Sequence, residues 1–430
     1  MPPYSPDRRT AVVLCGTGAH GAYHAGVLKA LQEAGVRMDL MAGQGVGAAG
    51  ATIAAMDGVS RLSDTDGIWR SPRATSLYHW TRPAQGSAVL LLVAVTVLVI
   101  GHILVALDVV PMTAQRWAAI VLGDALATIG AAVLVARWGR GGRRRAVGGW
   151  AWGVFGAAVD AEPARQLAAD AIWNGIKGAA PVQRPDTTAL GRRFSEVLTE
   201  NLGQPGFREV VTVATDLDAR RDVVAALLRE PFREEFLAPR AGRDRRAEVF
   251  DLAGVGRDHA VDIVSAALTP PVLCEPYAMT FAADGYWRGE THRTCDRPGT
   301  AARLLEEVAA AGVTQAIVVS AVASADAPHR LRMPRVDLRS RLGEFQSAAG
   351  AAALRDALEV ARLRFDAVYV VSPAHNAVGP FDLGGAYDEA SDRQQSLSEL
   401  VERGYEDAYR QFIEPVVGAS GDQLAREEVD

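Results

Sequence analysis

The sequence predicts an α/β fold with a mainly parallel sheet, into which a transmembrane helical hairpin is inserted. Short apolar runs that suit buried strands alternate with stretches of helical periodicity, a pattern typical of parallel sheets covered by helices on both faces. The alternation is interrupted once, by two long and almost uncharged runs between residues 88 and 136. These two observations predict the fold class and separate the α/β domain from the inserted segment.

The predicted strands are short and apolar, and the helices between them carry apolar residues at helical spacing. The first strand, Thr10–Cys15, is followed by a helix over Ala22–Ala34, which Gly35 ends. A second strand, Leu40–Ala42, leads through a glycine-rich turn into a helix that reaches Ile53. Later strands are predicted at Glu209–Thr215, Ala316–Val322 and Ala367–Val371, the last two preceded by helices at Ala301–Ala310 and Ala353–Arg364.

The two apolar runs are long enough to span a membrane. Ala88–Leu107 carries no formal charge, and Trp117–Ala136 carries only Asp124. Each has about twenty residues, which is enough to cross a hydrocarbon core of roughly 30 Å. The alternative is a pair of buried core helices in a soluble protein. We favour the hairpin because an arginine-rich stretch follows the second run.

The distribution of arginines predicts the orientation of the hairpin. Arginines flank both runs on their outer sides, whereas the loop between them holds only Arg116. The positive-inside rule then places both termini in the cytoplasm. We therefore expect a two-span protein of the plasma membrane. The predicted organisation is an N-terminal half of the α/β domain over residues 1–80, the hairpin over residues 81–150, and the rest of the domain over residues 151–430.

An acid within a membrane span needs a partner, because its insertion costs roughly 2.5 to 3.5 kcal/mol. His102 and Asp124 are expected at similar depths in the two antiparallel helices, so we predict that they pair. A hairpin that merely tolerates one acid near its end is the alternative. Small residues on the second run would also permit close helix approach, within the hairpin or between the subunits of a homo-oligomer. These residues are Gly123, Ala127 and Gly130.

The composition excludes several classes of protein. The 430 residues are 49% apolar, and the formal net charge is −6, from 45 basic and 51 acidic residues. No nucleic acid is therefore expected as a partner. Cys15, Cys274 and Cys295 are widely spaced and belong to no metal-binding pattern, so neither a disulfide framework nor a metal site is predicted. We also expect no cofactor.

Two glycine-rich turns carry the chemistry that the sequence suggests. The first, Gly16-Thr17-Gly18-Ala19-His20-Gly21, lies between a strand and a helix, where backbone amides and the helix N-terminus could hold an anion. It also satisfies the G-x-G-x-x-G pattern of nucleotide-binding turns. Asp39, however, precedes the second strand, whereas such a site needs its acid at the strand's far end. Nucleotide binding is therefore only a third hypothesis.

The second turn has the glycines of a nucleophile elbow without the nucleophile. Gly43-Gln44-Gly45-Val46-Gly47 places glycines at both ends of a G-x-S-x-G pattern, but Gly45 stands at the serine position. An elbow needs small flanking residues because its turn is crowded. The pattern thus indicates the shape of a hydrolase site and the loss of its reactive hydroxyl.

From these two turns onward, the chain resembles the patatin-like phospholipases. Leu14–Leu28 looks like that family's glycine-rich oxyanion segment, and Asp39–Ala51 looks like its elbow. The resemblance implies a patatin-like three-layer sandwich, a Ser-Asp dyad and a pocket shaped for acyl chains. Further similar segments are Val211–Val224, His259–Val272, Asp284–Glu290 and the stretches GPFDLGGAYD and LVERGYEDAY near the C-terminus.

The departures from the family pattern fall on the reactive positions. Gly45 replaces the serine, and the resemblance assigns the place of the dyad aspartate to Arg288. Gly45 cannot act as the nucleophile because glycine has no hydroxyl, and Arg288 cannot act as the base because arginine cannot accept a proton at neutral pH. Thr17 replaces the middle glycine of the oxyanion segment. We expect the remaining ligand-binding positions to be Gly16, Thr17, Gly18 and Gly21.

The sequence therefore predicts a membrane-anchored patatin-like protein, catalytically degenerate, that acts in lipid binding or regulation with membrane lipids as its partners. The alternative is an active lipid acyl hydrolase with a non-standard nucleophile. Candidates for that nucleophile or its base are Thr17, Cys15 and Glu290.

Overall fold

The computed structural model comprises two compact units, each described here by itself. Unit 1 consists of Met1–Tyr78, Ala161–Pro271 and Pro276–Asp430, and unit 2 consists of His79–Asp160 and Val272–Glu275. The residues that the structure describes are 4–107, 113, 117–118, 120–125, 127–130, 157–178, 181–238, 245, 247–283, 285, 287–322, 338–373, 378–388 and 393–418.

A nine-stranded sheet forms the middle of unit 1, and its main path runs β11-β10-β1-β2-β5-β6-β7. From β11 to β5 all neighbours are parallel, which confirms the predicted α/β class with a mainly parallel sheet. The strands of this parallel part are β11 (Ala367–Val371), β10 (Gln315–Ser320), β1 (Thr10–Gly16), β2 (Leu40–Gly45) and β5 (Glu209–Asp216).

The sequence analysis missed the strands beyond β5. β6 pairs antiparallel with β5 and parallel with β7, while β9 pairs antiparallel with both β5 and β8. The β8–β9 hairpin lies off the main path and leads directly to α10. These strands are β6 (Arg221–Leu227), β7 (Ala247–Asp251), β8 (Tyr277–Thr280) and β9 (Thr291–Cys295).

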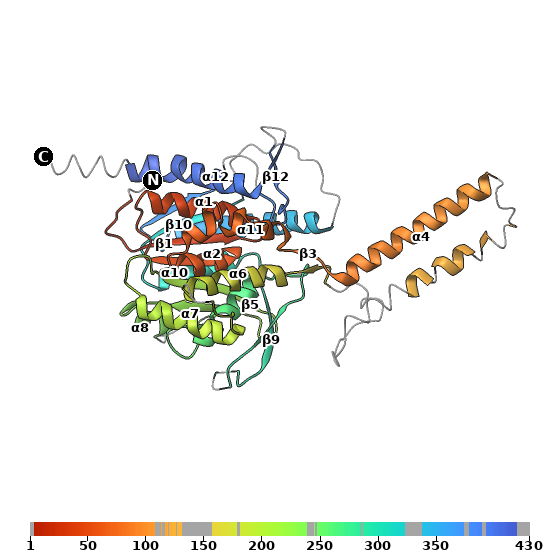
Figure 1. Ribbon diagram of the computed structural model, residues 1–430. Helices are drawn as coiled ribbons and strands as arrows, with labels where there is room; N and C mark the ends of the chain where they lie inside the picture. Colours follow the sequence, from red (N-terminus) through yellow and green to blue (C-terminus); the bar gives the residue numbers. More distant parts are fainter. Residues whose placement is uncertain are drawn as a thin grey trace. The chain divides into compact units, whose positions relative to one another are not determined.

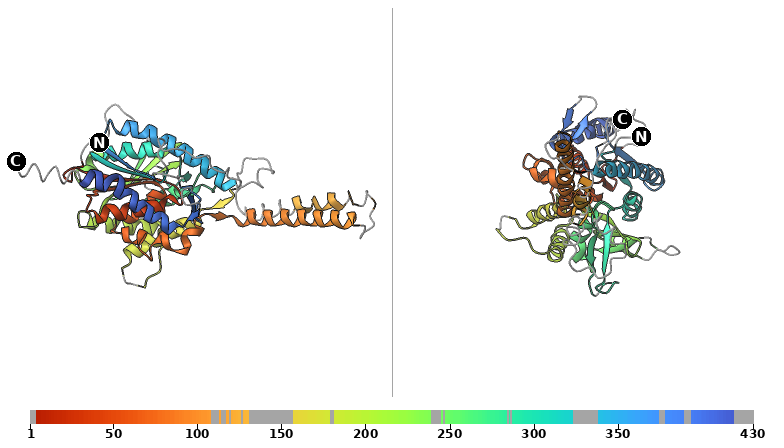
Figure 2. Two further views of the ribbon diagram at one scale, coloured as in Figure 1. Left: turned by 90° about the horizontal axis from the view of Figure 1, so that it is seen from above. Right: turned by 90° about the vertical axis from the view of Figure 1, so that its right-hand side faces the viewer.

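Helices cover both faces of the sheet, as the colours of Figure 2 show for unit 1. Alternate residues of β1, such as Ala11 and Val13, share a buried cluster with Leu304 of α10 and Leu354 of α11. Helices α1, α2 and α9 cover the opposite face, and α12 packs on α1. The strands are buried on both sides, which explains their continuous apolar runs.

Unit 1 contains longer helices and several shorter elements. The principal ones are α1 (His20–Glu33), α2 (Val46–Ala54), α6 (Glu162–Ile176), α7 (Thr187–Asn201), α9 (Ala260–Ala267), α10 (Thr300–Ala310), α11 (Leu338–Ala361) and α12 (Leu397–Ala408). Shorter elements are α3 (Val59–Ser63), η1 (Ile68–Arg70), η2 (Pro72–Ser76), α8 (Phe232–Leu237), η3 (Arg257–His259), η4 (Tyr409–Gly418), β12 (Ala386–Asp388) and β13 (Arg393–Gln395).

Unit 2 begins and ends on a short antiparallel ribbon. β3 (His79–Trp80) pairs with β4 (Val159–Asp160), and α4 (Arg82–Ala106) follows β3 (Figure 1). Large apolar side chains of α4 are about half exposed or more. They include Val89, Leu92, Val93, Val95, Val97, Val99, Ile100 and Ile103.

The two-span prediction requires correction. Within the described ranges, no helix combines the length and the apolarity that a membrane crossing requires. The inserted transmembrane hairpin and the two-span plasma-membrane topology are therefore not supported. The side chain of His102 and residues 131–156 lie outside the described part, so the predicted pair of His102 with Asp124 is untested. One carboxylate oxygen of Asp124, Oδ2, is buried without a hydrogen-bond partner among the described residues.

Candidate functional site

Gly45 forms a tight turn between the end of β2 and the start of α2. Its backbone angles, φ 57° and ψ −131°, lie in a region that favours glycine. A Cβ atom placed on Gly45 would lie 2.1 Å from the carbonyl oxygen of Gly16 and 3.0 Å from Oδ2 of Asp296. The space that a side chain at position 45 would need is already occupied by backbone.

The flanking glycines show that the turn is as crowded as its elbow pattern predicted. A Cβ atom on Gly43 would lie 2.1 Å from the carbonyl oxygen of Gly47, and one on Gly47 would lie 2.2 Å from that of Leu14. These contacts are far below the separation of non-bonded atoms. The elbow geometry is therefore present although its serine is absent.

Asp296 is the carboxylate that lies beside the elbow. It follows β9 directly and is buried. Its Oδ2 accepts a hydrogen bond from Thr17 Oγ1 at 3.0 Å, and its Oδ1 accepts one from the Arg297 amide at 2.9 Å. Burial raises the pKa of Asp296 to about 6, although both hydrogen bonds favour the charged form. An acid with this pKa could act as a proton acceptor near neutral pH.

Arg288 does not occupy the dyad position that the resemblance assigned to it. It lies exposed in the turn between β8 and β9, with φ 46°, and its amide donates to the Gly285 carbonyl. Asp296 lies at the other end of β9, next to Gly45. The hairpin thus separates the two positions by the length of a strand. Asp296, and not Arg288, is therefore the residue whose side chain lies beside position 45.

The oxyanion turn is closed by its own contacts. The Thr17 amide donates to Nδ1 of His20 at 3.1 Å, and Nε2 of His20 donates to the Val378 carbonyl at 2.7 Å. Burial lowers the pKa of His20 to about 4, so the ring is neutral and supplies one acceptor and one donor. The Ala19 amide donates to the Pro380 carbonyl. Both amides are therefore engaged within the protein.

The remaining glycines of this turn permit close packing. A Cβ atom on Gly18, where φ is 59°, would lie 2.0 Å from the Pro380 carbonyl oxygen, and one on Gly21 would lie 2.0 Å from the Trp69 ring. Gly16 directs its carbonyl oxygen, an acceptor, toward Gly45. Gly16, Thr17 and Gly18 thus lie next to the Gly45 turn, and the Thr17 amide is hydrogen-bonded to His20.

A cavity of about 40 Å³ adjoins Asp296. Its lining includes Thr17, Gln44 and Asp296 on one side and Gln346 and Ser347 of α11 on the other. Gln346 Oε1 and Ser347 Oγ are buried with no hydrogen-bond partner among the described residues. At roughly 10 to 15 Å³ per water, this space holds about three water molecules.

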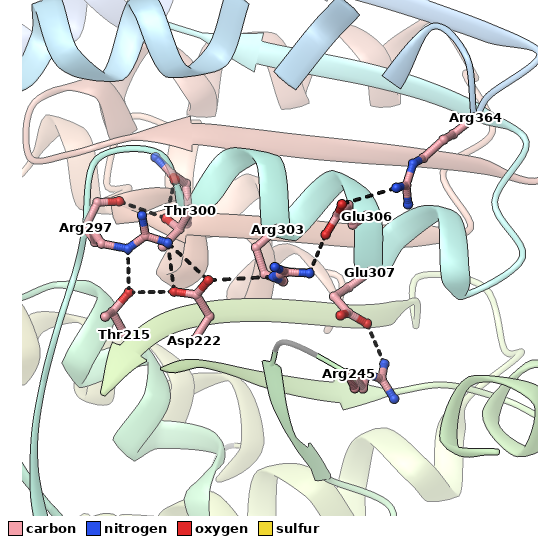
Figure 3. Close-up of polar contacts among 10 residues, drawn as sticks. Thr215, Asp222, Arg245, Arg297, Thr300, Arg303, Glu306, Glu307 and Arg364 are labelled. Atoms are coloured by element: carbon pink, nitrogen blue, oxygen red, sulfur yellow. Dashed lines mark hydrogen bonds and ion pairs between the residues drawn. The ribbon is translucent and has the colours of Figure 1, made fainter. Parts of the chain in front are cut away.

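An ion-pair network holds the segment that carries Asp296 (Figure 3). Arg297 donates to both oxygens of Asp222, at 3.0 and 3.1 Å, and Arg303 of α10 contacts the same carboxylate. Arg303 also binds Glu306, which accepts a hydrogen bond from Arg364. Thr300 Oγ1 donates to Gln44 Oε1 at 2.5 Å. These contacts fix the β9–α10 connection, and hence Asp296, against β6 and β2.

The geometry does not fit a nucleotide site. Asp39, the acid that such a site would use, lies just before β2 and accepts hydrogen bonds from the Thr10 amide and from Arg37. It is therefore at the opposite end of the parallel strands from the glycine turn. Nucleotides bind at the carboxyl ends of such strands, where Gly16 and Gly45 lie.

A strand, a tight glycine turn and a helix form the geometry of a nucleophile elbow, here beside a buried aspartate. The chain belongs to the patatin-like phospholipase family, because the family model described as "Patatin-like phospholipase" matches residues 12–286, more than half of the chain. That match confirms the resemblance. Asp296 lies ten residues beyond its end.

Two solved structures are similar to this chain at low identity. VipD from Legionella pneumophila is 14% identical with a TM-score of 0.33, and the match covers 95% of this chain and 67% of VipD. The type III effector protein ExoU is 14% identical with a TM-score of 0.29, and the match covers 95% of this chain and 54% of ExoU. The chain thus spans about half the length of ExoU. A comparison with curated proteins gave no match.

We expect Asp296 to make the stability of unit 1 depend on pH. Its folded pKa of about 6 exceeds its ordinary value of 3.8, so the folded state holds the proton more tightly. The resulting stabilisation is present below about pH 4 and is lost as the pH rises through 6. At 1.36 kcal/mol per pKa unit, the loss is about 3 kcal/mol.

Urea unfolding of the wild type and of Asp296→Asn at pH 4, 5, 6 and 7 measures this effect, because asparagine does not titrate. Between pH 4 and 6 the wild type should lose stability relative to the variant. Parallel profiles would show that Asp296 is not the group with the raised pKa.

Proposed function

We propose that this protein associates with membranes and binds lipid, and that it has lost ester hydrolysis by the Ser-Asp mechanism of its family. The family membership supports a lipid-related function. The observation that carries the loss of catalysis is the Gly16 carbonyl oxygen, which lies 2.1 Å from where a serine Cβ at position 45 would be. A missing hydroxyl and an occupied nucleophile position support the loss of the acyl-serine route.

The exposed apolar residues of α4 support the membrane association. Contiguous exposed apolar surface marks protein or membrane contacts. We propose that the exposed apolar residues of α4 insert into the surface of a lipid bilayer. An arginine placed on that face would have to lose its hydration shell or be kept out of the bilayer. Substitution of apolar residues there by arginine should therefore weaken the membrane association.

Flotation of the full-length protein with vesicles of phosphatidylcholine and phosphatidylglycerol tests this. We expect the double variant Leu92→Arg/Ile100→Arg to lose most of the flotation. Leu363→Arg/Val255→Arg is the matched control, because Leu363 and Val255 are 88% and 84% exposed in unit 1. Equal flotation of both variants would contradict a role of α4.

Self-association through unit 2 is a further part of the proposal. Gly123 and Gly130 are exposed, and a Cβ atom on either would meet nothing within 4 Å. Such small residues allow another helix to approach closely. We expect Gly123→Leu/Gly130→Leu to shift the detergent-solubilised protein to a smaller mass in light scattering. An unchanged mass would contradict assembly through these glycines.

A second candidate function, an acyl hydrolase with a different nucleophile, is favoured by one contact. Thr17 Oγ1 donates to Asp296 Oδ2 at 3.0 Å, a hydroxyl–carboxylate pair like that of a dyad. In such a reaction Thr17 Oγ would attack the ester carbonyl carbon and pass its proton to Asp296. The leaving alkoxide would take that proton, and water would then hydrolyse the acyl-threonine with Asp296 as base.

A fluorophosphonate probe separates the two functions. The degenerate protein should give no stoichiometric adduct by mass spectrometry, in native or denatured form. An adduct on Thr17 that disappears on denaturation and in Thr17→Val would establish the second function and overturn the first.

A further inference from the structure

The β8–β9 hairpin is joined to the sheet by few backbone contacts. β9 pairs with β5 at Cys295 and Thr294, and the Leu217 amide donates to the Arg293 carbonyl. Among the described residues, no backbone hydrogen bond joins the hairpin between Tyr277 and His292 to the rest of unit 1. The far end of the hairpin is therefore attached to the domain through side chains.

His292 of β9 lies between β5 and the far end of the hairpin. Its Nδ1 lies 2.6 Å from Oδ2 of Asp216, and its Nε2 lies 3.3 Å from Oε2 of Glu290. Asp216 ends β5 and is fully buried, whereas the Glu290 side chain is 65% exposed. The rings of Phe281 and Trp287 pack against the imidazole, with centroid distances of 4.8 and 4.5 Å. His292 is thus the link between a buried strand and an exposed turn.

Only a protonated His292 can donate to both carboxylates. Oδ1 of Asp216 already accepts the amides of Asp218 and Ala219, at 2.9 and 3.0 Å, and Oδ2 accepts from Nδ1–H. In a neutral ring, Nε2 would then turn a lone pair toward the Glu290 carboxylate, whereas an imidazolium donates to it. Burial lowers the pKa of His292, but the hydrogen bonds to Asp216 and Glu290 outweigh it and raise this pKa above its ordinary value of 6.5.

The other charged groups around His292 already have partners. Asp218, in the turn after β5, accepts hydrogen bonds from the amide and from Nε of Arg293, at 2.7 and 3.0 Å. Glu248 of β7 accepts the Trp287 indole N–H at 2.6 Å. Glu290 is therefore the carboxylate whose contact depends on the proton at Nε2.

A second histidine, His259, touches the same hairpin but would respond to pH in the opposite sense. Its ring lies 6.0 Å from that of Phe281, and its Nε2 accepts the Ala282 amide at 3.3 Å. Its Nδ1 lies 3.1 Å from Asp262 Oδ2. Protonation of Nε2 would remove the acceptor for Ala282 and loosen the hairpin in acid. The sign of the pH dependence therefore distinguishes His259 from His292.

We infer that His292 is a pH-sensitive switch for the β8–β9 hairpin. Its protonated form joins the far end of the hairpin to β5 through Glu290 and Asp216. Loss of the proton from Nε2 removes the bond to Glu290, so the hairpin end is less firmly attached as the pH rises. β9 continues directly into Asp296, so the switch lies on the strand that positions the carboxylate of the candidate site. The inference does not depend on the proposed lipid binding.

Hydrogen–deuterium exchange of the full-length protein, read at the Phe281 amide, tests the inference. This amide donates to the Glu290 carbonyl at 3.0 Å and so reports on the closed hairpin. After correction for the intrinsic exchange rate, its protection should fall about threefold between pH 6 and pH 8.5, the order expected for a partly exposed ion pair. Glu290→Gln changes an exposed side chain and should abolish most of this fall. His292→Gln, which does not titrate, should also give protection independent of pH.

Two matched variants should keep the pH dependence. Glu248→Gln retains an acceptor for Trp287 and leaves both contacts of His292, and Asp296→Asn removes the other group of this region with a raised pKa. Unchanged protection of the wild type across this pH range would overturn the inference. So would a fall in Glu290→Gln as large as that of the wild type. Lower protection at pH 6 than at pH 8.5 would also overturn it and would assign the dependence to His259.

Discussion

Gly45→Ser is expected to destabilise unit 1 by about 3 kcal/mol and to leave the protein without esterase activity. The new side chain must adopt φ 57°, which costs a non-glycine residue about 1 to 3 kcal/mol. Its Cβ must also displace the Gly16 carbonyl oxygen, and overpacking of this kind typically costs 1 to 3 kcal/mol. Urea denaturation and hydrolysis of p-nitrophenyl esters measure the two effects.

Gly50→Ser is the matched control for stability, because a Cβ there would approach only the flexible end of Leu14, at 3.2 Å. Adding Arg288→Asp to Gly45→Ser should change nothing further, since Asp296 already lies beside position 45. A stable Gly45→Ser variant that hydrolyses esters would show that the Gly16 peptide can turn away. The loss of ester hydrolysis would then result only from the missing serine hydroxyl at position 45.

Gly26→Ala is expected to destabilise the protein by about 3 kcal/mol, because α1 and α12 pack backbone against backbone at this point. A Cβ atom on Gly26 would lie 1.8 Å from the Val401 carbonyl oxygen. On the other helix, a Cβ on Gly404 would lie 2.2 Å from the Tyr23 carbonyl oxygen. The helices must therefore move apart, which exceeds the small gain in helix propensity from alanine.

Gly350→Ala in α11 is the control, since a Cβ there meets nothing within 4 Å. It should stabilise the protein by about 0.5 to 1 kcal/mol. The difference between the two urea midpoints measures the closeness of the α1–α12 contact. Similar midpoints would mean that the helices are separated by more than the structure indicates.

The parallel part of the sheet could be predicted because its signals are local. β1, β2, β5, β10 and β11 are apolar runs bounded by turns, and all were predicted to within a few residues. The elbow at Gly45 was also evident, since its glycines are adjacent in sequence. The antiparallel strands carry weaker signals, because several of their residues are charged.

The acid of the site could not be found from sequence. No glycine follows Asp296, whereas Arg288-Gly289-Glu290 stands in the segment that resembles the family's motif, so the resemblance pointed to Arg288. The contact that identifies Asp296 joins it to Thr17, 279 residues away. Its burial, and with it the raised pKa, exists only once the sheet has formed. The direction of the Gly16 carbonyl is likewise invisible in the sequence.

The central place of β1 in the sheet also affects how the chain can be synthesised. Thr10 of β1 pairs with Gln315 of β10, so one edge of the first strand stays without its partner until some 305 residues later have been made. At 5 to 20 residues per second, this interval is about 15 to 60 s. Throughout it a β-branched, apolar strand edge is open to other chains. The nascent protein should therefore depend on a ribosome-associated chaperone far more than its mature stability would suggest.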